Sequence, residues 1–231
     1  MSLTLSYQKL SPWLYSPLDR AGRAYLEMHL DLLNDESDAF LELFIAEHKD
    51  VQEEQDRLRL ARYILRDASA RGKTPQAVRE AYINVFGGLI LDPPVWLQEI
   101  EQQWTHLLAA PLTERSATLC KLRLRAALGQ AQADPQAPLE MWAELSYLLG
   151  NLFANDLLKR PAGTFEGIIH YYTSALQVYV PERYPLRCAK ILMTMGHACY
   201  YQAARQHPDL YLQATRYYGQ ALGIYHACET I

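Results

Sequence analysis

Apolar residues recur every three to four positions along most of this chain, with polar residues between them. This spacing places the apolar side chains on one face of an α-helix. Strict alternation of apolar and polar residues, which half-buried strands require, is absent from the sequence. The pattern therefore predicts an all-α protein, with helices over about 18–33, 37–48, 51–70, 75–86, 93–108, 113–133, 139–158, 164–180, 185–206 and 209–227.

Two dipeptides mark helix starts, and one proline-rich stretch marks a linker. Ser16-Pro17 and Thr74-Pro75 each place a capping hydroxyl before a proline, a residue that fits the first turn of a helix. The helical spacing is interrupted most clearly between Asp134 and Pro138. We therefore expect two domains, a helical N-terminal region over residues 1–138 and a second region over 139–231.

The second region repeats itself at an interval of 46 residues. A shared interval in separate segments is typical of stacked repeats, in which each unit buries the apolar face of its neighbour. The repeated positions are Ala143, Gly150, Tyr171, Tyr172, Ala175, Leu176 and Tyr179 in the first copy and Ala189, Gly196, Tyr217, Tyr218, Ala221, Leu222 and Tyr225 in the second.

The repeated residues resemble the tetratricopeptide repeat, which has a small residue in its first helix and Ala-x3-aromatic-x2-Ala in its second. Pro181 matches the proline that ends a unit of that family. A standard unit has ~34 residues, whereas this one has 46. Long units of this kind resemble arrays in bacterial, notably cyanobacterial, multidomain proteins, often beside caspase-like (CHAT) protease or signalling domains. The resemblance implies a helix–turn–helix repeat solenoid, with residues 1–138 as degenerate repeats or a helical capping bundle.

Composition and charge narrow the function classes. The net charge of −4 argues against a general nucleic-acid binder, which usually carries a strong basic excess. The four cysteines form no C-x-x-C pair, as expected for reduced thiols in a cytoplasm. The sequence contains no run of ~18 apolar residues, which is the length needed to span a membrane. The N-terminus lacks the features of a signal peptide. These observations predict a cytoplasmic protein that binds neither nucleic acid nor membrane.

Motifs for catalysis or for metal binding are absent. None of the seven histidines belongs to an H-E-x-x-H motif. Cys188, Cys199 and His197 lie in one predicted helix, where neighbours seldom align as a nucleophile and base. Gly87-Gly88 lacks the Lys-Ser/Thr of a phosphate-binding loop. We therefore expect no enzymatic activity, no cofactor and no metal.

Tyrosines are concentrated in the repeats, where ten of the sixteen follow residue 170. Adjacent tyrosines on a helix cannot all point inward, because successive residues are ~100° apart. Some therefore remain exposed, and exposed tyrosine favours protein interfaces. The resemblance further implies a concave ligand groove lined by the first helix of each unit, and it gives asparagine at position 151 the role of gripping a ligand backbone. The expected groove residues are Tyr147, Asn151, Ala154 and Asn155 from the first unit and Met193, His197, Tyr200 and Tyr201 from the second.

These expectations favour a non-catalytic scaffold or adaptor that binds a partner protein or peptide and recruits or regulates an effector such as a protease. Glu144 and Lys190 give the groove mixed charge, so ligand binding should depend only moderately on salt. One alternative is an enzyme or small-molecule sensor with a closed cavity near Arg57–Arg66, and an open groove on the repeats would favour the scaffold instead. Another is self-assembly into a homo-oligomer, because no polar capping helix follows the last repeat before Ile231.

Overall fold

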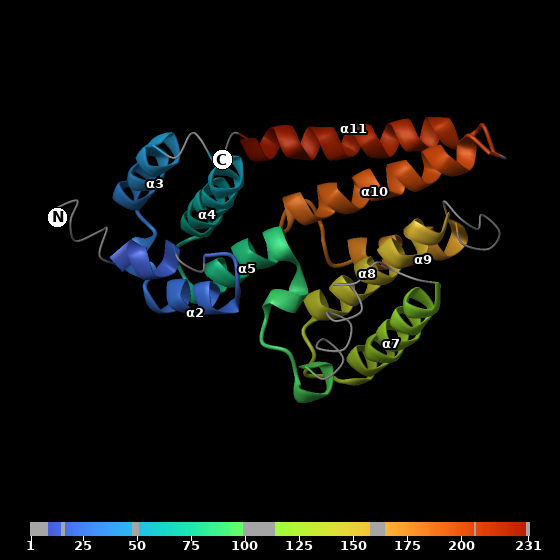
Figure 1. The fold of residues 1–231 in the computed structure, drawn as a ribbon, viewed down its shortest axis with the longest axis horizontal. Coiled ribbons are helices and arrows are strands. Elements are labelled where there is room, and N and C mark those ends of the chain that lie inside the picture. The colour runs from blue at the N-terminus through green and yellow to red at the C-terminus, as the bar shows by residue number, and fades with distance from the viewer. Residues whose placement is uncertain are drawn as a thin grey trace. The chain divides into compact units, whose positions relative to one another are not determined.

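The computed structural model describes residues 9–14, 17–47, 51–98, 114–157, 165–205 and 207–229. Every regular element in these ranges is a helix, which confirms the all-α prediction. No helix in the described part of the chain combines the length and the apolar character that crossing a membrane requires. The chain forms two compact units, Met1–Phe86 and Gly87–Thr230 (Figure 1).

The first unit packs its helices around a core of leucine, isoleucine and aromatic side chains. The indole of Trp13 donates to the Tyr82 hydroxyl at 2.9 Å, and this hydroxyl donates to the Pro17 carbonyl at 2.7 Å. Both aromatic side chains are fully buried, so these bonds satisfy their polar atoms. The elements are a helical segment at 9–14, α2 (Arg20–Met28), η1 (Leu30–Leu32), α3 (Asp35–Glu47), α4 (Gln52–Ala70) and α5 (Pro75–Phe86).

Helix starts in the first unit follow capping chemistry. The Thr74 hydroxyl accepts a bond from the Ala77 backbone at 3.1 Å, as the Thr74-Pro75 pair predicts. Ser16 lies outside the described residues, and α2 begins after Asp19, whose carboxylate accepts from the Gly22 backbone at 2.7 Å. The predicted helix over 18–33 is therefore too long at both ends, because this cap sets a later start and a 3₁₀ turn follows Met28.

The second unit contains the repeated sequence. Its elements are η2 (Gly88–Ile90), a helical turn at 95–98, α7 (Glu114–Ala133), α8 (Leu139–Leu157), α9 (Phe165–Leu176), α10 (Pro185–Ala203) and α11 (Leu210–Glu229). Residues 87–98 and 114–138 lie in this unit, and α7 packs on α8 through a shared apolar cluster. The boundary between the compact units therefore follows Phe86 rather than the linker between Asp134 and Pro138.

The two predicted helices at 164–180 and 209–227 end differently from the expectation. Helix α9 stops at Leu176, and turns lead from there to α10. Tyr179 is fully buried beyond the end of α9, and Pro181 cannot donate a backbone bond that would extend the helix. Helix α11 has no proline at the equivalent place and continues to Glu229.

The contacts of the first helix pair recur in the second pair. Helices α8 and α10 begin and end 46 residues apart, at Leu139 and Leu157 and at Pro185 and Ala203. A Cβ atom added to the glycine of the first helix would lie 2.4 Å from the Tyr172 ring in one pair and 2.6 Å from the Tyr218 ring in the other. The absence of a side chain at both glycines therefore lets a tyrosine of the second helix lie against the first helix.

Candidate functional site

A buried polar network lies between α8, the end of α9 and the start of α10. The Arg187 guanidinium pairs with the Glu144 carboxylate, with 3.0 Å between Nε and Oε2, and both side chains are only 4% exposed. The Tyr179 hydroxyl lies 3.0 Å from the same Oε2 and accepts from the Gly88 backbone at 2.9 Å. Burial disfavours the charged form of Arg187, but the charge of Glu144, the hydrogen bond that it accepts from Arg187 and the nearby Tyr179 and Tyr147 together outweigh this effect, so the pKa of Arg187 is raised.

Gly87 makes room for this ion pair. Its φ of +83° lies in the left-handed region, and an added Cβ would lie 1.9 Å from Oε2 of Glu144. Gly87-Gly88, which lacks the sequence of a phosphate-binding loop, therefore has a packing role beside the ion pair. Glu144 was expected among the charges of a ligand groove, and this expectation is wrong because Arg187 covers it.

The groove positions predicted on α8 are largely used inside the protein. Tyr147 is 4% exposed, its ring lies 5.9 Å from that of Tyr172, and the Arg187 guanidinium lies 4.4 Å from its centre. Asn151 is half-buried, and its side-chain oxygen accepts from the Tyr172 hydroxyl at 2.8 Å. The prediction that Tyr147 lines an open groove is therefore wrong. The side chain of Asn155 lies outside the described residues, and Ala154 is half-buried.

The predicted positions on α10 are more accessible. Tyr200 and Tyr201 are 48% and 45% exposed, with ring centres 5.9 Å apart. Tyr211, at the start of α11, is 42% exposed, and its ring centre lies 5.6 Å from that of Tyr200. His197 is exposed one turn earlier and contacts the Tyr218 ring edge-on at 5.4 Å. We call Tyr200, Tyr201 and Tyr211 the tyrosine surface.

The structure adds Tyr211 to the residues that the sequence singled out. The signal was its place two residues after the turn between two repeated helices, but sequence spacing does not show that it reaches Tyr200. Met193, by contrast, is half-buried and packs against the apolar cluster around Cys188, Leu192 and Ala221. Met193 therefore lies at the border of the exposed face of α10, and only part of its side chain is open to solvent.

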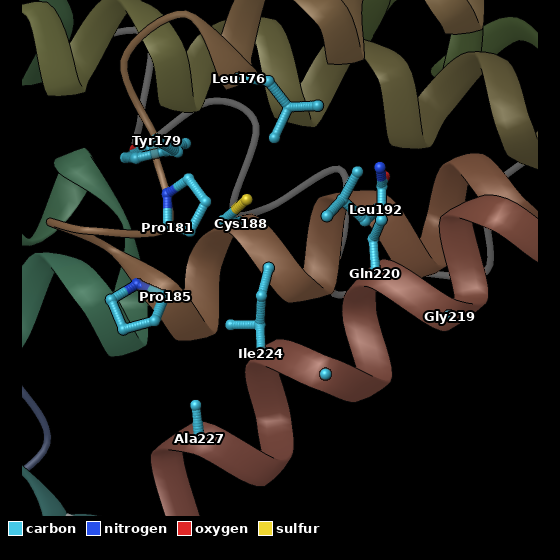
Figure 2. A pocket seen from close by; sticks show the side chains of 11 residues that line it. Leu176, Tyr179, Pro181, Pro185, Cys188, Leu192, Gly219, Gln220, Ile224 and Ala227 are labelled. Carbon is cyan, nitrogen blue, oxygen red and sulfur yellow. The ribbon is translucent and has the colours of Figure 1, made fainter.

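An open groove of about 610 Å³ lies between the end of α9, the first half of α10 and the second half of α11 (Figure 2). Leu176, Leu192 and Ile224 enter it from the three helices. Gly219 and Gly223 widen it, since a Cβ added to either would meet no atom within 4 Å. The family resemblance predicts a groove on the first helices of the repeats, whereas this one is lined by the second helices α9 and α11 together with the first half of α10.

The cysteines of α10 are buried thiols. Burial raises the pKa of Cys188 and of Cys199 to about 11, so neither is a thiolate near neutral pH. Cys199 is buried while His197 is exposed, so the two side chains lie on different faces of the helix. Within the residues that the structure describes, no three His, Cys, Asp or Glu side chains are grouped to hold a metal ion.

Arg57, Arg59 and Arg62 of α4, where the alternative site was predicted, form ion pairs. Arg62 binds Asp38 through two bonds of 2.7 and 2.8 Å and also reaches Glu42 at 3.0 Å. The hydrogen bond from Arg62 holds the pKa of Asp38 below its usual value. Arg57 pairs with Glu54 within α4. These side chains therefore have partners within the unit.

Comparisons with models of protein families, with curated proteins and with solved structures give no match for this chain. The functional proposal below rests on the exposed side chains of α10 and α11.

Proposed function

We propose that residues 139–231 are a tetratricopeptide-like repeat solenoid that binds a partner protein or peptide and catalyses no reaction. The repeated glycine–tyrosine contact supports this architecture, since it links the same positions in both helix pairs. An open groove on the repeats, rather than a closed cavity with converging polar groups, favours a scaffold over an enzyme or a sensor.

The tyrosine surface is the observation that carries the proposal. Tyrosine provides a large contact area at a low cost in side-chain entropy, and it is enriched at protein interfaces. Tyr200, Tyr201 and Tyr211 leave nearly half of their area open to solvent, although each ring contacts another. Contact between the rings restrains them before a partner arrives, which lowers the cost of ordering them on binding.

The role of each predicted residue follows from its contacts. Tyr200, Tyr201 and His197 bind the partner directly, and Met193 borders the contact. Asn151 supports the fold instead, because its side-chain oxygen is occupied by the Tyr172 hydroxyl. The scaffold recruits or regulates an effector, and the resemblance to arrays beside caspase-like protease domains favours a protease as that effector.

The test compares proteins captured from a lysate of the source organism by the full chain and by its Tyr200→Ala/Tyr201→Ala variant. We expect the variant to lose the specific partner at least tenfold, which corresponds to about 1.4 kcal/mol. A matched control is Leu119→Ala/Leu122→Ala, which removes exposed apolar side chains from α7 in the same unit. Equal capture by the tyrosine variant and the wild type, with circular dichroism unchanged, would show that the tyrosine surface binds no partner.

A further inference from the structure

Helix α10 covers one face of the first helix pair. Residues of α8 and α9 on that face are buried: Glu144 pairs with Arg187, Tyr147 lies under its guanidinium, and Tyr172 is fully enclosed. Leu176 packs against the apolar cluster of α10 and α11. The face therefore consists of one charged, two aromatic and one aliphatic position, which α10 covers with a contribution from α11 at Leu176.

The same four positions recur 46 residues later as Lys190, Met193, Tyr218 and Leu222. We call these residues the docking face. Lys190 is exposed, Met193 and Tyr218 are half-buried, and Leu222 is 57% exposed. The second pair therefore leaves open a face whose equivalent in the first pair is closed by a helix.

The charge on this face is inverted between the two pairs. The first pair presents a carboxylate, Glu144, and the helix that covers it supplies Arg187. The second pair presents Lys190, which forms no ion pair within the described residues. Partial desolvation and the positive charge of Arg187 lower the pKa of Lys190 more than the nearby Glu144 raises it, so an added carboxylate would stabilise its charged form. A helix that covers the docking face therefore needs a negative charge where α10 has Arg187.

We propose that the docking face binds an amphipathic α-helix of a partner protein that places a carboxylate against Lys190. The neighbouring apolar positions suit such a helix, because Leu222 and Tyr218 offer aliphatic and aromatic area and Met193 adapts to an irregular surface. The inference deepens the proposed function by naming the chemistry of the partner. It concerns a different set of side chains from the tyrosine surface.

The probe is derived from α10, since α10 covers the equivalent face of the first pair. Two labelled peptides with the sequence of residues 184–203 are titrated with the full chain, one unchanged and one with Arg187→Glu. Fluorescence anisotropy should show that the Glu peptide binds the wild type at least fivefold more tightly. The Lys190→Glu protein should reverse this preference, and Leu222→Asp should weaken the binding of both peptides.

Arg216→Glu is the matched control, because it makes the same charge change on α11 outside the docking face. Its first-pair equivalent, His170, stays exposed although α10 covers that pair, so a docked helix should leave residue 216 free. This variant should keep the wild-type preference. The inference is overturned if neither peptide binds, if both bind equally, or if Lys190→Glu leaves the preference unchanged.

A second copy of this chain could cover the docking face instead of a partner helix. Sedimentation velocity of the full chain at rising concentration tests this alternative. A dimer that Leu222→Asp dissociates would mean that a second copy covers the docking face, which also overturns the inference. The two proposals fail separately. If Lys190→Glu leaves the peptide preference unchanged, only the proposal of an acidic helix is refuted. If Tyr200→Ala/Tyr201→Ala leaves partner capture unchanged, only the role of the tyrosine surface is refuted.

Discussion

The helix pairs α8–α9 and α10–α11 share a sequence pattern but differ in what their equivalent residues contact. In both, a glycine of the first helix lies against a tyrosine of the second. The residue one position after the glycine differs, since Asn151 accepts a hydrogen bond from Tyr172 whereas His197 meets Tyr218 edge-on. The repeated glycine and tyrosine set the distance between the two helices of a pair. The residue after the glycine differs between the pairs, as does the helix that packs against each pair.

The largest difference should appear at the charged position of the two pairs. Arg187→Met leaves the Glu144 carboxylate buried without its partner, which should cost about 3–5 kcal/mol in the free energy of unfolding. Lys190→Met, at the position equivalent to Glu144, removes an exposed charge and should change stability by less than about 0.5 kcal/mol. Urea denaturation followed by circular dichroism measures both values.

Similar costs for Arg187→Met and Lys190→Met would mean that the buried ion pair gives the first pair no special dependence on its partner helix. Glu144→Gln is a useful control, since it keeps the volume and removes the charge. It leaves the buried Arg187 guanidinium without its partner in turn, so its cost should be similar to that of Arg187→Met.

A smaller difference should appear at the repeated glycines. Gly150→Ala pushes a methyl group into the ring of Tyr172, which is fully buried and hydrogen-bonded, so it should cost about 1–3 kcal/mol by overpacking. Gly196→Ala should cost less, because Tyr218 is half-exposed and its ring can move. Thermal denaturation and urea titration rank the two variants.

Gly129→Ala in α7 provides the reference for the glycines. No atom lies within 4 Å of an added Cβ there, so the change should stabilise the helix by about 0.5–1 kcal/mol. If Gly150→Ala gave the same gain, the close contact with Tyr172 would not be what requires a glycine.

Helix positions could be predicted well where local chemistry decides them. Thr74 caps α5, and α8 and α10 start where the spacing placed them. Pro181 limits how far α9 extends, but the stop at Leu176 accompanies a hydrogen bond between Tyr179 and Gly88, which lies 91 residues away in the sequence. A contact over such a distance leaves no local pattern.

The candidate site shows the same division. The adjacent pair Tyr200-Tyr201 had to leave some aromatic surface exposed, since neighbours on a helix cannot both face inward, and both rings are open to solvent. Tyr147 and Asn151 occupy groove positions by resemblance, but contacts with Arg187 and Tyr172 decide what they do. Whether a residue of a repeat is exposed therefore depends on the next helix as well as on its own place in the repeat.

The smallest expected difference between the two helix pairs is in how the free energy of unfolding falls at alkaline pH. Burial raises the pKa values of Tyr172 and Tyr218 above the usual value of 10.0. Tyr218 is less deeply buried than Tyr172. Below pH 10 both states keep these protons, so the contribution to stability is fully present. Above it the unfolded chain releases the Tyr172 proton while the folded protein retains it, and stability falls until the pH passes the folded pKa.

For a fully buried tyrosine such as Tyr172 this loss is about 1.4 kcal/mol by pH 11 relative to neutral pH. Tyr172→Phe removes the titrating group, so the free energy of unfolding of this variant should fall less steeply between pH 9.5 and 11 than that of the wild type. Tyr218→Phe should flatten the profile less, because its hydroxyl is closer to solvent in the open pair. Urea titrations across this range measure the slopes, and the wild-type slope sets the background from the other tyrosines. Equal slopes for the two variants would show that the covering helix α10 does not change the environment of the repeated tyrosine.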